Sequence, residues 1–110
     1  MELTIGERIA LSSVLPLQGN AVTLRIIQEA RLKLSFTEAE IKDLGIENHM
    51  LPQGGANITW NPKKANVTTD IEIGEAVNSI IVKELTRLDA TNRLHLTMLP
   101  LYKKFVEKEA

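Results

Sequence analysis

The chain has 110 residues, 44% of them hydrophobic and 25% charged, which excludes a wholly disordered protein and fits a single small domain over residues 1–110. It contains no cysteine, so disulfides, thiolate nucleophiles and zinc–thiolate sites are excluded. The 13 basic and 14 acidic residues give a net charge of −1, and this balance argues against nucleic acid as the main partner.

Signals for secretion or membrane insertion are not visible in the sequence. Met1 is followed by an acidic residue rather than by a basic region leading into an apolar run, so we expect no signal peptide. No apolar stretch approaches the length of a membrane span. We therefore expect a cytoplasmic protein with no membrane partner.

The first part of the chain has the spacing of two helices. Thr4 and Glu7 fit a capping box, in which each side chain satisfies a backbone N–H at a helix start. Pro16 disfavours helix at the residue before it, so the first predicted helix covers residues 4–15. Apolar residues recur at helical spacing over residues 22–34, which predicts the second helix.

A third, short helix is predicted over residues 38–44. Thr37 and Glu40 repeat the capping-box pattern at its start. Gly45 is suited to the left-handed conformation that ends many helices.

The middle of the chain predicts a β-hairpin. Residues 56–60 and 65–71 are rich in β-branched side chains, and the Asn-Pro-Lys-Lys sequence at residues 61–64 is typical of a turn. A bare two-stranded hairpin is only marginally stable in water. We therefore expect it to pack against the helices or to pair with another strand.

Two further helices are predicted after the hairpin. Residues 73–88 have the clearest amphipathic stripe in the chain. The last helix covers residues 98–108, and Pro100 fits its first turn if Thr97 is the N-cap, because N–H groups there have no intrahelical acceptor.

The expected fold class is therefore α+β, with four to five helices and one β-hairpin in the middle of the chain. Aromatic residues make up only 4% of the chain, so the core must be mainly aliphatic. We expect the core to include Ile9, Ile26, Ile27, Ile41, Val77, Ile80, Ile81, Leu85, Tyr102 and Phe105.

No motif identifies a catalytic, cofactor-binding or metal site. His49 and His95 are the only histidines, and they lack the HxxxH or HExxH spacing of a metal-binding helix. We therefore expect a non-catalytic protein without a cofactor. The alternative is a small hydrolase or metal-dependent enzyme that uses His49 or His95 with nearby carboxylates.

Trp60, Lys63 and Lys64 are the candidate partner contacts. They lie on or beside the predicted hairpin turn, and an aromatic ring beside two cations could contact nucleic acid or an acidic partner. The simpler interpretation is that Trp60 packs against the core and the lysines are solvated. A nucleic-acid-binding accessory protein that uses the hairpin is a second alternative.

Several segments resemble small phage and prophage proteins of unknown function. The likeness touches both ends of the chain but not its middle, and consists of LTIGERI (3–9), LPLQGN (15–20), TL (23–24), FTEAE (36–40) and LYKKF (101–105). The resemblance implies a viral or prophage gene expressed in a bacterial cytoplasm. It implies no catalytic residue, because that family has none assigned.

These observations favour a non-catalytic binding or assembly protein of phage or prophage origin. Its partner would be a second copy of the chain or another protein. A homodimer is predicted, because a hairpin has unpaired edge groups and the last two helical stripes are wide for one small core. Its interface would use the hairpin, the last helix or both. The alternative is a monomer whose hairpin folds onto its own helices.

Overall fold

The structure is a computed structural model that describes residues 1–50, 52, 54 and 56–107. Within these residues it has five α-helices and two antiparallel two-stranded sheets, which confirms the predicted α+β class with a hairpin in mid-chain. In chain order the elements are β1 (Glu2–Thr4), α1 (Ile5–Val14), α2 (Ala21–Leu34), α3 (Glu38–Leu44), β2 (Glu47–Met50), β3 (Ala56–Thr59), a 3-10 turn (Pro62–Lys64), β4 (Thr68–Asp70), α4 (Glu75–Ala90), a second 3-10 turn (Leu96–Met98), α5 (Leu99–Tyr102) and a wider helical turn (Lys103–Glu107).

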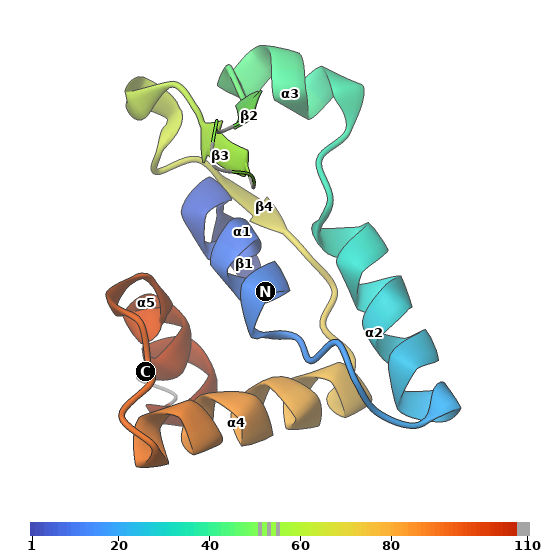
Figure 1. The fold of residues 1–110 in the computed structure, drawn as a ribbon. Coiled ribbons are helices and arrows are strands. Elements are labelled where there is room, and N and C mark those ends of the chain that lie inside the picture. The colour runs from blue at the N-terminus through green and yellow to red at the C-terminus, as the bar shows by residue number, and fades with distance from the viewer. Residues whose placement is uncertain (51, 53, 55, 108–110) are drawn as a thin grey trace.

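Helix α1 lies at the centre of the molecule (Figure 1). It contacts β1, α2, α4 and α5, while α4 runs across one end of the molecule and α3 with the β2–β3 hairpin lies at the other. The core between α1, α2, α4 and the C-terminal helical turns is apolar, and its fully buried members include Leu3, Leu11, Ile81, Leu85, Leu101 and Phe105. The hairpin and α3 contribute no residue to this cluster and project from it.

The helix boundaries follow the local signals in the sequence. Both capping boxes are present, with Thr4 accepting from the Glu7 N–H and Thr37 accepting from the Glu40 N–H. Helix α3 has the predicted bounds, and α4 is shifted by two residues from its predicted range. The last helical segment was predicted over residues 98–108 and begins earlier, because His95 caps a 3-10 turn there. Its predicted end, residue 108, lies outside the described residues. Within the described ranges, every helix falls short of the length and apolarity needed to cross a membrane.

The two sheets connect segments at very different distances along the chain. Strands β1 and β4 pair antiparallel, with Glu2 opposite Asp70, and Leu3 on β1 is completely buried in the apolar core. Strands β2 and β3 form the hairpin, with Glu47 opposite Thr59. The long-range sheet therefore ties the first residues to the core, and the local hairpin stands apart from it.

The predicted pairing of residues 56–60 with residues 65–71 is wrong. Residues 56–59 pair with β2, and residues 68–70 pair with β1. The reason lies in the connection: Asn61 accepts from the Lys63 N–H at 3.0 Å and starts a 3-10 turn, whereas a tight hairpin needs a turn with the twist of its strands. The Asn61 N–H also donates to the Leu44 carbonyl at 3.0 Å, which ties the start of this turn to the end of α3.

The predicted core is confirmed in part. Ile27, Ile81, Leu85 and Phe105 are buried, and the remaining predicted members other than Ile41 are half-buried. The prediction that Ile41 belongs to the core is wrong, since its side chain is 41% exposed. Helix α3 lies beyond the helical core, so only its last residue is buried and Ile41 faces an open groove.

Candidate docking groove

An open groove with a cavity volume of about 640 Å³ runs beside α1. Its walls come from α1, α2, the segment that joins α2 to α3, α3 itself and the hairpin. The lining is mostly apolar and includes Ile9, Leu17, Phe36, Ile41, Ile46 and Ile58. Leu17, Ile41 and Ile58 are 81%, 41% and 37% exposed, so apolar surface is presented to solvent along the groove. Exposed apolar surface of this kind is suited to contact with another apolar surface, because such contact removes it from water.

The end of α3 places two of these side chains on the groove. Gly45 adopts φ 65°, as predicted, and its N–H donates to the Ile41 carbonyl. The Ile46 N–H donates to the same carbonyl at 3.0 Å, which is the bond pattern of a helix that ends on a left-handed glycine. The chain therefore reverses so that Ile41 and Ile46 both line the groove.

Arg8 fixes the wall of the groove that lies between α1 and α3. Its side chain is only 2% exposed and donates from Nε to the Leu34 carbonyl at 3.2 Å and from Nη2 to the Ser35 carbonyl at 2.6 Å. Nη1 donates to Glu40 Oε2 at 2.6 Å, and the guanidinium carbon lies 4.0 Å from the centre of the Phe36 ring. We call this set of contacts the Arg8 clamp. It connects α1 to the end of α2, to Phe36 and to α3.

Glu40 serves both the clamp and the start of α3. Its Oε1 accepts the Thr37 N–H at 3.0 Å, while Oε2 accepts from Arg8. Hydrogen bonds from Arg8 are the largest influence on this carboxyl and, with the Thr37 N–H, they hold its pKa below the ordinary value despite partial burial. The carboxylate is therefore ionised and fully engaged at neutral pH.

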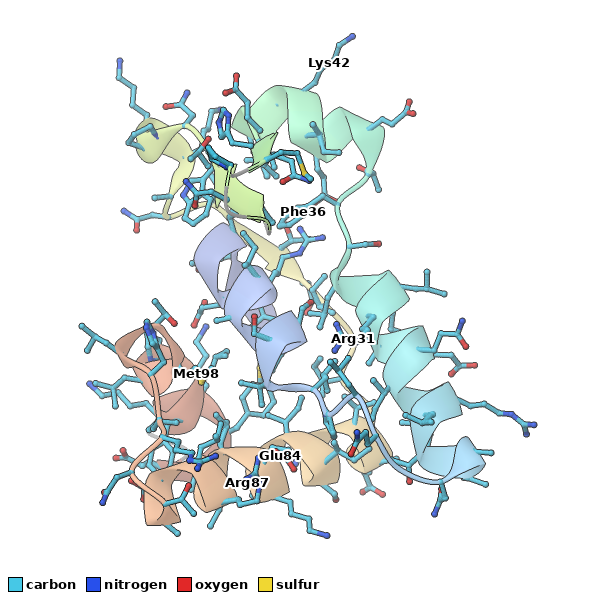
Figure 2. The ribbon with its side chains drawn as sticks, in the orientation of Figure 1. Arg31, Phe36, Lys42, Glu84, Arg87 and Met98 are labelled. Carbon is cyan, nitrogen blue, oxygen red and sulfur yellow. The ribbon has the colours of Figure 1, made fainter. Side chains whose placement is uncertain are left out.

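Arg31 is the second cation of the groove and is bound differently. Its Nη2 donates to the Leu15 carbonyl at 3.1 Å, and the side chain lies on the side of α2 that faces α1 (Figure 2). Among the described residues it has no carboxylate partner within ion-pair distance. Lys42, the cation of α3, points away from the body of the molecule (Figure 2).

A second groove of about 530 Å³ lies on the other side of Ile9 and Ile58, which line both grooves. Trp60 lines this second groove, and its ring lies against Gly6 of α1, where an added Cβ would meet ring carbons at 3.8 and 3.9 Å. Thr97 and Pro100 form the opposite wall. The two grooves therefore meet at the exposed side of α1.

The wall of the second groove is fixed by an ion pair from the C-terminal turn. Lys104 Nζ donates to a carboxylate oxygen of Glu7 at 2.9 Å and to the Glu2 carbonyl at 2.9 Å. Burial raises the pKa of Glu7, but hydrogen bonds from the Thr4 backbone and from Lys104 outweigh it, so the net pKa lies below the ordinary value. The last helical turn is thus held to β1 and α1 at once.

The three predicted contact residues do not lie in one site. Trp60 is half-buried against α1 but is not part of the apolar core cluster, while Lys63 and Lys64 lie on the following 3-10 turn and line neither groove. The ring and the two cations therefore do not share either groove.

The two histidines lie in separate parts of the fold. His49 is half-exposed on β2, with Nε2 at 3.3 Å from Glu47 Oε2 and 3.1 Å from Thr59 Oγ1. His95 Nδ1 accepts the Thr97 N–H at 3.2 Å and caps the turn before α5. In the part of the chain that the structure describes, no three His, Asp or Glu side chains are grouped as a metal site.

Sequence reasoning missed both arginines of the groove, although one of them left a signal. Arg8 follows Ile5 by three residues and precedes Leu11 by three, so it lies on the buried stripe of the first helix. A charged residue on such a stripe requires partners when it is buried, which could have identified it. Arg31 carries no comparable signal, because the residues of the groove come from distant parts of the sequence.

The main groove combines apolar side chains with guanidinium and hydroxyl groups. Its described polar members are two arginines and three serines. An apolar surface with guanidinium groups is a composition typical of protein interfaces. No protein-family model, curated protein or solved structure matches the chain.

Proposed function

We propose that this chain is a non-catalytic docking protein that binds an apolar segment of a partner protein in the main groove. The observation that carries the proposal is the open apolar lining, with Ile41 and Ile58 exposed along it. Apolar anchors seated in such pockets supply most of the binding energy in protein interfaces. The Arg8 clamp adds support, because a wall that is fixed in advance need not be ordered by the partner.

The proposed setting is particle assembly or host interference by a phage or prophage protein in a bacterial cytoplasm. The support for this setting is the resemblance of the segments at residues 3–9, 15–20, 36–40 and 101–105 to phage and prophage proteins. The groove provides the binding surface that an assembly role requires. The setting itself is tested by capture of the partner during phage or prophage induction in the native host.

Selection of random linear peptides on the purified protein tests the groove directly. Peptides with apolar anchors are expected, and Ile41→Glu or Ile58→Glu should weaken their binding by about tenfold or more, because each places a charge on the apolar lining. Leu32→Glu is the matched control, since Leu32 is 70% exposed on α2 and is not part of this lining.

The comparison of these variants decides the proposal. Equal loss of binding in the Leu32 variant and the groove variants would indicate a general charge effect and overturn it. Failure to select any peptide whose binding depends on Ile41 or Ile58 would also overturn it. Amide shifts confined to the lining residues on peptide addition would support it.

Self-association is a second candidate, favoured by two exposed apolar side chains. Met50 on β2 and Leu96 before α5 are each 79% exposed. Both lie outside the hairpin over residues 56–71 and the helix over residues 98–108 that the sequence predicted as the dimer interface. Light scattering over a range of concentrations should show a dimer mass that persists at high salt and is lost in Met50→Glu or Leu96→Glu. A monomer mass at the highest concentration would remove this candidate.

A further inference from the structure

The charges of the main groove have one sign. Among the residues that the structure describes, Arg8 and Arg31 are the only charged ones that line it. The Arg8 guanidinium is already occupied by Glu40 and two carbonyls, whereas Arg31 has no carboxylate partner among the described residues. The groove therefore has one positive charge available to a partner, in otherwise apolar surroundings.

We infer that the partner segment carries an acidic side chain or a terminal carboxylate that pairs with Arg31, beside the apolar side chains that fill the groove. This inference rests on the proposed function and specifies the chemistry of the partner. A guanidinium has five N–H donors in a planar fork, and Arg31 uses one nitrogen to reach the Leu15 carbonyl. The remaining donors match the two oxygens of a carboxylate.

The bond to Leu15 prepares Arg31 for this role. Leu15 is 2% exposed and follows α1 directly, so its carbonyl is a fixed acceptor that restrains a long side chain. Restraint before binding lowers the conformational entropy lost on pairing. The half-buried position of Arg31 also reduces screening by water, which strengthens attraction to an opposite charge.

A carboxylate fits better than a phosphoryl group because of charge balance. One carboxylate neutralises one guanidinium, whereas a phosphoryl group carries nearly two negative charges at neutral pH. The excess charge would lie against apolar lining without a second available cation among the described residues. The expected partner motif is therefore an Asp, a Glu or a chain end flanked by large apolar residues.

The test uses the selected peptides and three arginine variants. The peptides should be enriched in Asp or Glu at a constant spacing from their apolar anchors. Arg31→Gln should weaken binding by about tenfold, and Arg31→Lys should retain part of it because the charge remains. Arg25→Gln is the matched control, because Arg25 is exposed on the same helix and lines neither groove. Unfolding curves of each variant verify that the fold is retained.

A charge exchange makes the assignment specific. Arg31→Glu should lose the acidic peptides, and replacing the acidic residue of the peptide by Arg should restore binding to that variant alone. Peptides that depend on Ile41 but are indifferent to Arg31→Gln would overturn this inference and leave the proposed function standing. Absence of groove-dependent peptides would overturn both. Binding of dodecanoate but of no peptide would likewise overturn both, since the groove would then bind the carboxylate of a lipid and not a protein segment.

Discussion

Arg8 and Glu40 join the first and third helices through a bond of 2.6 Å between Nη1 and Oε2. The two residues are 32 positions apart, and Glu40 also accepts the Thr37 N–H that begins α3. One carboxylate therefore sets both where α3 starts and how it is attached to α1. The shape of the main groove depends on this attachment, because α3 supplies one of its walls.

The first prediction concerns the loss of the clamp. Arg8→Met should destabilise the chain by about 3 kcal/mol, since it leaves the Glu40 carboxylate and two carbonyls without their donor. Arg8→Lys should recover little, because an ammonium cannot replace the planar fork. Urea denaturation measures both. A change for Arg8→Met below about 0.5 kcal/mol would show that the clamp adds nothing to stability.

The second prediction concerns pH. The pKa values of Glu40 and Glu7 are lowered in the folded chain. As the pH falls, the unfolded chain therefore binds more protons than the folded chain does. The contribution of Glu40 and Glu7 to stability is therefore complete above about pH 5 and is lost as the pH falls through the lowered values. Urea unfolding should show a smaller loss for Glu40→Gln than for the unaltered chain between about pH 5 and pH 3. Parallel pH profiles for the two proteins would contradict the assignment.

The third prediction compares two isoleucines, one buried in the core and one exposed on the groove. Ile81→Ala should cost about 2–5 kcal/mol, because Ile81 is 0% exposed within the helical core. Ile41→Ala should cost less than about 1 kcal/mol, since Ile41 lines an open groove. Thermal unfolding of the two variants measures the difference. Equal losses would place Ile41 in the core, contrary to the structure.

The fourth prediction compares two glycines. Gly45→Ala should cost about 1–2 kcal/mol, because φ 65° is strained for a residue with a Cβ, which would also lie 3.4 Å from Asn61 Cβ. Gly6→Ala should instead leave stability unchanged or raise it by up to about 1 kcal/mol, since Gly6 is helical and its Cβ would make ordinary contacts with Trp60. Denaturation midpoints provide the test. A stabilising Gly45→Ala would contradict the left-handed helix end.

Local signals in the sequence predicted the helices well and the strand pairing poorly. A capping box needs residues three positions apart, so Thr37 and Glu40 could be recognised from the sequence alone. Strand β1 has three residues and no alternation long enough to detect, and its partner β4 lies more than sixty residues away. Nothing local distinguishes that pairing from the hairpin that the sequence predicted.

The candidate site was less predictable than the fold, for a related reason. Its lining is assembled from residues 8 to 58, and an open groove is a property of their arrangement rather than of any one segment. Trp60 was a candidate because it lies beside two lysines in the sequence, and the structure places it in the neighbouring groove. Arg8 was detectable as a charge on an apolar stripe, whereas Arg31 became notable only when its surroundings were known.

The bond from Lys104 to the Glu2 carbonyl has a kinetic consequence. It joins residues that are 102 positions apart. Strand β1 likewise pairs with a strand that lies far along the chain, β4. During synthesis on the ribosome, β1 therefore remains unpaired until residues 68–70 have emerged, and Glu2 and Glu7 lack their Lys104 contacts until residue 104 has emerged. Contacts at such separations slow folding, because loop-closure entropy is lost before the contact forms. The pairing of β1 with β4 and the Lys104 contacts are therefore expected to slow folding of this domain, however readily its capped helices form.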